Sequence, residues 1–440
     1  MAEPTSEDKK QAEPEHLDLR DPHFRAKAYE TYATLRARGP VARVRFTPGD
    51  DDEADNQARG PFGRPVFMVT RYQEAVDALL DERFTMDART TMTPEQLEKL
   101  PPTPEEFRPL SRSILSVDPP DHTRLRKLVQ PSFSERAMKS LRPRVQQIAE
   151  DLLTSAEQAA AERGESYPNR QMDLIDAYAY PLPITVISEL LGVPEEDRAN
   201  IRRWSETLFS GGRARGQEMS EEARTSLREF TAYLRDLFEE KRREPADDLI
   251  SRLVHAEEDG DVLSEDELLS MVFILIVAGH VTTVNLIGNA VMALLTHPDQ
   301  LERLKADPSL AKSAVEETLR YWGPAETVVP RFAREDIQIN GTRIPKGETL
   351  MVSLASADRD PTRFPDPDDF ELGRAEANRH IAFGKGIHMC LGAPLARLEG
   401  QIALNVLLAR MPDLRLAVEP EEIAWRAGFL RGIDRLPILF

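Results

Sequence analysis

The stretch Phe383–Arg397 reads Phe-Gly-Lys-Gly-Ile-His-Met-Cys-Leu-Gly-Ala-Pro-Leu-Ala-Arg and holds Cys390, the only cysteine among 440 residues. Three glycines bracket the sulfur, so something wide and flat could approach the backbone there: Gly384, Gly386 and Gly392. Further along, apolar residues recur at the spacing of one buried helical face, at Leu391, Leu395, Leu398, Ile402 and Val406. The predicted helix ends at Met411, before Pro412.

Cys390 is therefore predicted to lie at a helix N-terminus. Unpaired backbone N–H groups and the positive end of the helix dipole favour an anion there, so we expect a thiolate, against a free thiol pKa of about 8.5. A lone cysteine in a long chain is more often a small core hydrophobe. The glycines and His388, two residues upstream, favour a functional sulfur instead.

This loop resembles, residue by residue, the haem-thiolate loop of the cytochrome P-450 family, Phe-Gly-x-Gly-x-His-x-Cys-x-Gly. The resemblance implies that Cys390 is the metal ligand, bound to the iron of haem b. It further implies that Phe383 packs beside the sulfur, that His388 lies near a haem propionate, and that Gly384 and Gly392 belong to the cofactor-binding loop.

Composition limits the class of protein. Lysine and arginine total 57 against 76 aspartates and glutamates, a net charge of −19, which argues against nucleic acid or an anionic membrane surface as the main partner. One cysteine excludes an internal disulfide and fits a reducing compartment. The first 20 residues are polar, without the apolar core of a signal peptide. We expect a cytoplasmic, bacterial-type protein with a disordered tail over residues 1–19 and one domain over 20–440.

The most apolar helix is predicted to run from about residue 264 to 295. Ser264-Glu-Asp-Glu267 is a capping box that opens it. A membrane span is disfavoured because His280, Asn285 and Asn289 interrupt the apolar run and no basic anchor flanks it. A buried central helix fits better. Its middle, Ala278-Gly-His-Val-Thr-Thr283, is locally weak, since glycine costs about 1 kcal/mol and threonine hydroxyls can bond back to i−4 carbonyls.

In the family that the chain resembles, the long distal helix carries Ala-Gly-x-acid-Thr over the iron. The resemblance implies that Ala278 and Gly279 make room for O2 and that Thr282 passes protons to it. Val281 stands where the family has an acid. Proton delivery would then depend on Thr282 with ordered water, on His280, or on a substrate hydroxyl.

Other motifs acquire roles through the same resemblance. His122 and Arg126, four residues apart on one helical face, could together grip a carboxylate and are implied to bind haem propionates, as is Arg331. Glu317 and Arg320 would normally be a weak surface ion pair. The resemblance implies instead a buried structural triad with Arg374. It also places Thr327, Val328 and, within Gly428–Gly432, Leu430 at the substrate pocket beside Val281.

Helices dominate the remaining pattern, so we expect a mainly α fold with a small β region, which the resemblance extends to the single-domain cytochrome P-450 fold. Helical patterns cover residues 21–39, 72–80, 134–163, 174–191, 194–209 and 220–241, with a break at Gly211-Gly212. Strand patterns cover 41–46, 65–70 and 348–355, with a hairpin at Asn340-Gly341. Residues 47–59 form an acidic insertion, and prolines break residues 86–109 so that they cannot form one continuous helix.

The resemblance implies a monooxygenase that inserts one atom of O2 into a C–H bond or alkene of a lipophilic small molecule, a polyketide macrolide or other secondary metabolite. Fatty-acid, terpenoid or steroid hydroxylases remain alternatives, as do an oxygen-inactive haem-thiolate sensor and a haem-free scaffold. The length leaves no room for a fused flavin reductase, so electrons from NAD(P)H would arrive through ferredoxin reductase and ferredoxin. We expect a monomer that docks ferredoxin on a basic patch of Arg124, Lys127, Lys385 and Arg397.

Overall fold

Local capping signals set the start of the main helices in the computed structural model, which describes residues 13–46, 64–100, 103–211, 220–258 and 261–440. Asp21 caps the first helix by accepting from the His23 N–H, and Pro22 occupies the first turn. Ser264 and Glu267 form the predicted capping box, since each side chain accepts from the other residue's backbone N–H.

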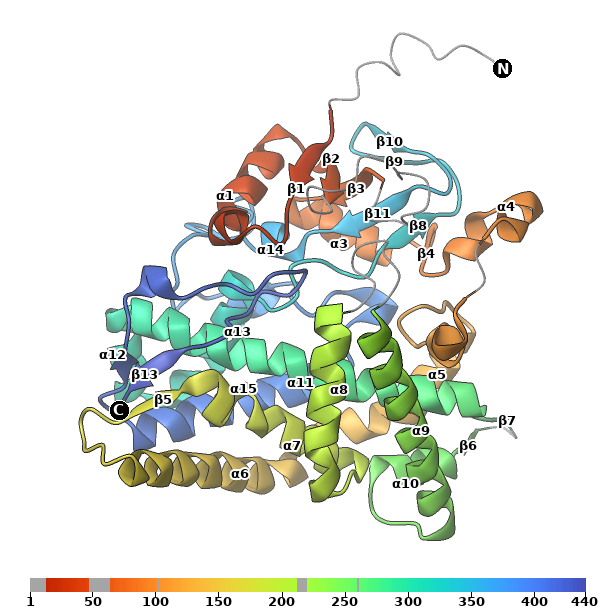
Figure 1. Cartoon of the computed structure of the whole chain (residues 1–440). Helices are drawn as coiled ribbons and strands as arrows, with labels where there is room; N and C mark the ends of the chain where they lie inside the picture. Colours follow the sequence, from red (N-terminus) through yellow and green to blue (C-terminus); the bar gives the residue numbers. More distant parts are fainter. Residues whose placement is uncertain (1–12, 47–63, 101–102, 212–219, 259–260) are drawn as a thin grey trace.

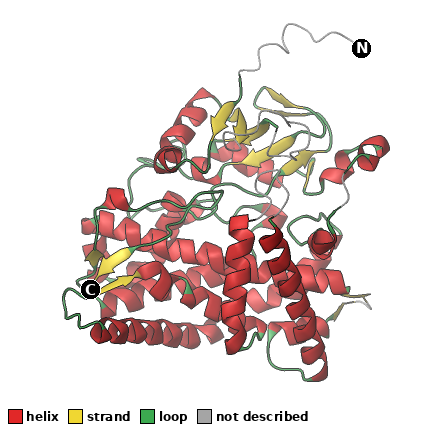
Figure 2. Cartoon of the chain, viewed as in Figure 1, coloured by secondary structure: helices red, strands yellow, loops and turns green. Residues whose placement is uncertain are grey.

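The helices form most of the molecule, which confirms the mainly α prediction (Figure 2). Their bounds are α1 (Pro22–Arg38), α3 (Tyr72–Leu80), α4 (Pro94–Glu98), α5 (Asp121–Val129), α6 (Glu135–Glu162), α7 (Pro181–Leu191), α8 (Arg198–Gly211), α9 (Glu221–Arg243), α10 (Leu249–Val254), α11 (Glu265–Thr296), α12 (Pro298–Ala306), α13 (Ala311–Trp322), α14 (Leu354–Ala357) and α15 (Ala393–Arg410). Short 3-10 and α turns replace a continuous helix over the described part of 86–109, as expected.

The strands gather mainly at the upper end of Figure 1, beside α1 and α3. Their bounds are β1 (Glu15–Leu17), β2 (Val41–Phe46), β3 (Val66–Val69), β4 (Phe84–Thr85), β5 (Gln171–Asp173), β6 (Glu257–Glu258), β7 (Asp261–Val262), β8 (Arg331–Ala333), β9 (Ile337–Ile339), β10 (Thr342–Ile344), β11 (Thr349–Val352), β12 (Arg415–Leu416) and β13 (Pro437–Leu439). The largest sheet among the described residues has the order β1-β2-β3-β11-β8-β4. β1 with β2 and β3 with β11 are parallel, and its other pairs are antiparallel.

Helix α11 is the centre of the helical body, where it packs against α7, α13 and α15 (Figure 1). Residues 283–294 of this helix are buried. The main hydrophobic core joins these helices to α6, and separate apolar clusters fill the two faces of the upper sheet, one of them under α1. The core therefore holds α11 and α15, the helices adjoining the candidate site, in fixed relation.

Four predictions about local structure need correction. Leu17 in the tail is fully buried, because β1 pairs with β2 over residues 15–17, so that part of the tail is ordered. The predicted helix over 174–191 is a π-helical turn, Ile175–Ala179, followed by α7, because Pro181 has no N–H to continue a single hydrogen-bond ladder. The pattern at 194–209 begins as a 3-10 turn, Glu195–Asp197, before α8. The strand predicted to reach residue 355 ends at Val352, since Ser353 caps α14.

Other expectations agree with the structure or fall outside it. Asn340 and Gly341 take φ angles of 46° and 87°, the left-handed conformation of a tight hairpin turn between β9 and β10. The insertion at 47–59 lies outside the described residues, as do residues 1–12 of the tail and Gly212 at the predicted break.

Candidate functional site

The Cys390 loop is built by glycine backbone geometry. Gly384 and Gly386 have φ angles of 70° and 77°, which residues with a side chain rarely adopt. A Cβ on Gly386 would also lie 3.0 Å from the Leu79 carbonyl oxygen of α3. The Cys390 N–H donates to the Phe383 carbonyl at 2.9 Å and closes the loop. Gly392 is the N-cap of α15, so the sulfur stands just before the helix.

Burial opposes the thiolate that is predicted at this helix end. Burial raises the pKa of the Cys390 thiol, although the N–H groups of Gly392 and Ala393 and the charges of Arg126 and Arg397 lower it. Cys390 is exposed to solvent, although the protein around its thiol disfavours the charged form. Desolvation therefore outweighs the helix terminus, and a stable thiolate needs a further positive partner, such as a metal ion.

The middle of α11 borders an open space. Ala278 is exposed and Thr282 half-buried, although the next three turns of the helix are buried. The Thr282 hydroxyl donates to the Ala278 carbonyl at 2.8 Å, and Thr283 donates to Gly279 at 3.3 Å, as expected for back-bonding threonines. Val281 is only 7% exposed. This stretch thus combines small residues and two threonine hydroxyls, of which that of Thr282 is half-buried, and it has no acid.

His280 is separated from that opening by its own contacts. It is fully buried, its Nδ1–H donates to the Ile276 carbonyl at 2.7 Å, and its Nε2 lies 3.4 Å from the Tyr180 hydroxyl. Burial lowers the pKa of His280 to about 4, so the ring is neutral at neutral pH. In this arrangement His280 supports the π-helical turn and α11 and holds no proton to deliver to the Thr282 side.

A group of histidine and arginine side chains lies at the Cys390 loop. The His122 and His388 rings have centroids 4.2 Å apart. Arg126 on α5 donates to the carbonyls of Ile387 and Met389 at 3.0 and 2.8 Å and so grips the loop on both sides of His388. Both ring nitrogens of His388 and Nε of Arg331 are buried without a hydrogen-bond partner in the described part of the chain. Burial lowers the pKa of Arg331 and takes that of His388 to about 4.

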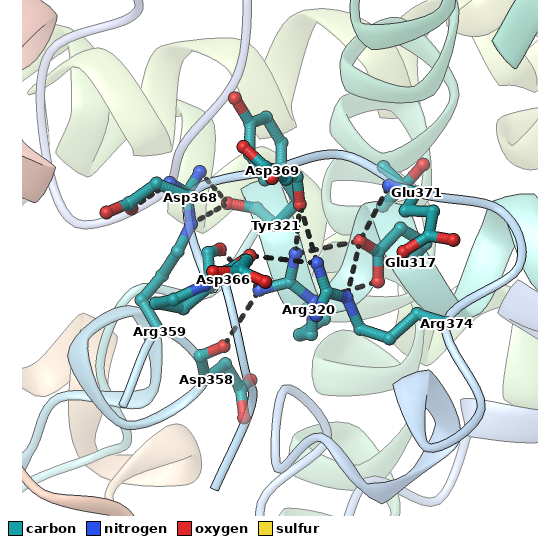
Figure 3. Close-up of polar contacts among 12 residues, drawn as sticks. Glu317, Arg320, Tyr321, Asp358, Arg359, Asp366, Asp368, Asp369, Glu371 and Arg374 are labelled. Atoms are coloured by element: carbon teal, nitrogen blue, oxygen red, sulfur yellow. Dashed lines mark hydrogen bonds and ion pairs between the residues drawn. The ribbon is translucent and has the colours of Figure 1, made fainter. Parts of the chain in front are cut away.

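Glu317, Arg320 and Arg374 meet in a buried network (Figure 3). Glu317 binds Arg320 at 2.8 Å and Arg374 at 3.0 Å, and the Glu317 and Arg320 side chains are fully buried. Arg320 also donates to the carbonyls of Asp358, Pro367 and Asp369. The network therefore fastens α13 to residues 358–374, away from any opening.

The predicted pocket residues Thr327, Val328 and Leu430 are all half-buried. Leu430 forms an isolated antiparallel β-bridge with Ala325, and Thr327 forms one with Ser353. The turn at 428–432 therefore lies against the extended run after Gly323, and the two segments form one wall. Sequence reasoning missed the acid next to them. Glu326 is 1% exposed and lies between Arg25 and Arg431. Nothing in its local pattern marks it, because its partners come from opposite ends of the chain.

α11 is long and apolar enough to cross a membrane. However, 67% of its most apolar window is buried inside the protein. This burial favours the core helix that the polar interruptions predicted.

Comparison with known proteins gives the family. The family model described as Cytochrome P-450 matches residues 65–411. The chain belongs to the cytochrome P-450 family. It is 46% identical to the cytochrome P-450 monooxygenase PikC of Streptomyces venezuelae, over 94% of this chain and 91% of that protein. It is 44% identical to the polyketide biosynthesis cytochrome P-450 PksS of Bacillus subtilis, over 85% of this chain and 89% of that protein.

A solved structure agrees. The myxobacterial cytochrome P-450 CYP267B1 in complex with myristic acid has a TM-score of 0.84 and 42% identity, covering 96% of this chain and 98% of that one. The expected fold is therefore confirmed, and the protein is a haem-thiolate monooxygenase that uses O2.

The residues present fit a haem. A single accessible thiol, a neighbouring group of buried histidine and arginine nitrogens that lack partners, and an open stretch of the central helix are what an iron ligand, two propionates and a flat ring require. Cytochrome P-450 chemistry also accounts for Cys390, because binding a metal favours the thiolate that burial opposes.

Proposed function

We propose that this cytochrome P-450 oxygenates a C–H bond or alkene of a lipophilic small molecule, a polyketide macrolide or other secondary metabolite. The observation that carries the proposal is the open, small-residue stretch of α11, together with the half-buried residues Val328 and Leu430. The turn that carries Leu430 contacts the same helix, since the Asn289 side chain donates to the Arg431 carbonyl. We assign Val281, the apolar residue at the position of the family's acid, to the same pocket. The similarity to PksS, a cytochrome P-450 of polyketide biosynthesis, supports this substrate class.

Cofactor binding is assigned residue by residue. Cys390 is the thiolate ligand, Phe383 packs beside it, and Gly384 and Gly392 let the loop approach the ring. His122, Arg126, Arg331 and His388 hold the propionates, which supply acceptors for the unpartnered nitrogens of His388 and Arg331. When bound, haem b activates O2 for transfer of one oxygen atom to the substrate. Glu317, Arg320 and Arg374 stabilise the core on that side.

Thr282 is the proposed proton-handling residue. Ala278 is exposed beside its hydroxyl, which donates to the Ala278 carbonyl. Gly279 serves the packing of α11 on α7 instead of widening this opening, because a Cβ there would lie 3.2 Å from the Ile187 side chain. Because Val281 is not an acid and His280 is buried and neutral, protons reach Thr282 through water or a substrate hydroxyl.

Electrons come from NAD(P)H through ferredoxin reductase and ferredoxin. The basic patch that we expected is partly neutralised, since Arg124 pairs with Glu267 and Arg397 with Glu316. Lys127 and Lys385 are the other two members of the patch, and both are exposed at the surface. Charge reversal at Lys127 and Lys385 should raise the KM for ferredoxin and weaken its salt dependence. Unchanged values would exclude this docking surface.

We also propose a cytoplasmic monomer in which residues 20–440 act as one domain. Sedimentation of the haem-loaded protein at several concentrations tests the monomer. A mass that rises with concentration would contradict it.

Titration of the ferric protein with macrolides, fatty acids, steroids and terpenoids tests the substrate class. A saturable low-spin to high-spin shift with macrolides, followed by oxygenated product, is expected. A shift only with fatty acids would favour the alternative that the myristic acid complex of CYP267B1 suggests. NADPH consumption without product from any compound would favour a sensor.

The ligand assignment has its own test. The reduced, CO-bound protein should show a red-shifted Soret band that Cys390→Ser abolishes. Absence of the band in the unaltered protein would overturn the assignment and favour a haem-free scaffold.

A further inference from the structure

Glu316 lies beside Glu317 in the sequence but has a separate set of partners. Its carboxylate accepts from Nε and Nη2 of Arg397 at 2.6 and 2.9 Å, and from Nε2 of His380 at 3.2 Å. Glu316 is 5% exposed. Burial alone would raise the pKa of Glu316, but the hydrogen bonds from His380 and Arg397 lower it to about 2. A permanent buried anion therefore joins α13 to α15 and to the chain before the Cys390 loop.

His380 has a defined tautomer in this network. Its Nδ1 accepts from the Ala382 N–H at 3.1 Å, so the proton lies on Nε2, which donates to Glu316. The ring centroid lies 5.9 Å from that of Phe383. His380 thus fixes the backbone immediately before Phe383 and also contacts its ring.

Arg397 holds the same phenylalanine from the other direction. Its guanidinium carbon lies 4.6 Å from the Phe383 ring centroid, a cation–π contact, while both of its bonded nitrogens are engaged by Glu316. The Phe383 carbonyl accepts from the Cys390 N–H. One continuous set of contacts therefore runs from Glu316, through His380 and Arg397, to Phe383 and the ligand cysteine.

We propose that Glu316, His380 and Arg397 form a clamp of positioning residues that holds Phe383 and the Cys390 loop and sets the charge beside the sulfur. The inference rests on the proposed ligand role of Cys390. Groups around a metal ligand control its orientation and donor strength, and with them the reduction potential. The clamp thus gives Glu316 a role distinct from that of Glu317, whose network does not reach the loop.

The test uses the full, haem-loaded protein and two variants with opposite expectations. Glu316→Gln leaves the Arg397 charge uncompensated, so at a fixed applied potential the ferrous-to-ferric ratio should rise by about threefold or more. Arg397→Gln removes that positive charge, so the ratio should fall by a similar factor. Both should convert the red-shifted Soret band of the CO complex to its blue-shifted form faster than the unaltered protein does.

Glu157→Gln is the matched control. Glu157 of α6 accepts two hydrogen bonds, at 3.0 and 2.8 Å, from Arg410. Arg410 lies on α15 as Arg397 does, but at the C-terminal end of that helix. It should change neither the ratio nor the band. Arg397→Lys keeps the positive charge but loses the two parallel hydrogen bonds of the guanidinium group. The ferrous-to-ferric ratio should therefore stay the same, while the red-shifted Soret band should convert faster.

The outcomes separate the clamp from the ligand assignment. If Glu316→Gln and Arg397→Gln leave ratio and band unchanged while Cys390→Ser loses the band, the clamp is wrong and the ligand stands. If both variants shift the ferrous-to-ferric ratio in the same direction, a general loosening of the Cys390 loop explains the shift better than a change of charge. That result would overturn the proposal. The Arg397 side chain is one-third exposed, so its variants are expected to fold. They test the clamp even if Glu316→Gln does not fold. If the unaltered protein lacks the red-shifted Soret band of the CO complex, both the ligand assignment and the clamp are wrong.

Discussion

Thr282 is the residue on which coupling of electrons to product should depend. Its hydroxyl stands at the open stretch of α11, next to Val281 rather than an acid. Thr282→Ala should lower product per NADPH by about fivefold or more and release the difference as hydrogen peroxide, because proton delivery loses the half-buried hydroxyl of Thr282, whereas that of Thr283 is buried. Thr282→Ser keeps the hydroxyl and should retain most of the coupling. Equal coupling in the alanine variant would contradict the role.

Glu399 predicts a pH dependence of stability. Burial raises the pKa of this α15 carboxyl from 4.5 to about 8, and neither of its oxygens has a hydrogen-bond partner among the described residues. Folding therefore favours the protonated acid, and its contribution is fully present below pH 4.5 and lost as pH rises toward 8. Glu399→Gln should be more stable than the unaltered protein at pH 8, by roughly 2–5 kcal/mol, and similar to it at acid pH.

Urea unfolding at pH 4.5 and pH 8 measures this difference. The same substitution at Glu302, whose side chain is 70% exposed, should leave the pH dependence as it is. Parallel curves for Glu399→Gln and the unaltered protein would show that the acid is solvated or paired when the protein is folded.

At the scale of elements, α13 is fastened to the later chain by the Glu317 network. Glu317→Gln leaves Arg320 buried with less compensation, so the free energy of unfolding should fall by roughly 3–5 kcal/mol. Denaturant unfolding, read by fluorescence and by haem release, measures the loss. Glu302→Gln, which breaks only the exposed pair with Lys305, should change stability by less than about 0.5 kcal/mol. A similar small effect at Glu317 would mean that the network contributes little.

Elements with local signals could be predicted from the sequence. The caps at Asp21 and Ser264, the turn at Asn340-Gly341 and the Cys390 loop all depend on residues within a few positions of one another. The π-helical turn before α7 could not be predicted, since a helical pattern does not specify which carbonyl each N–H will find. The effect of burial on the Cys390 thiol could not be predicted either, because desolvation depends on the whole fold.

The site depends both on local spacing in the sequence and on contacts between distant segments. Spacing places His122 and Arg126 on one face, but their approach to the Cys390 loop joins residues more than 250 positions apart. The Glu316 clamp and the buried Glu326 have no signal in a single sequence, because each acid takes partners from distant segments. Such contacts become visible only when the chain is folded.

At the scale of the whole molecule, Glu326 joins the two ends of the chain. Its carboxylate binds Arg25 of α1 at 2.5 Å and Arg431 of the C-terminal turn at 3.5 Å, and all three side chains are almost fully buried. Arg25 also donates to the carbonyls of Arg426 and Leu430. The N-terminal helix therefore supports the turn that carries the proposed pocket residue Leu430.

Glu326→Gln should leave two buried cations without a counter-charge and lower the free energy of unfolding by roughly 3–5 kcal/mol. The substrate-induced spin shift should weaken as well, since the turn at Leu430 loses its support. Glu15→Gln, which breaks the exposed pair between β1 and Arg38 of α1, should leave the spin shift unchanged and alter the free energy of unfolding by less than about 0.5 kcal/mol. Lost stability with an unchanged spin shift would limit Glu326 to holding the ends together, and unchanged stability would show that Arg25 and Arg431 find other partners.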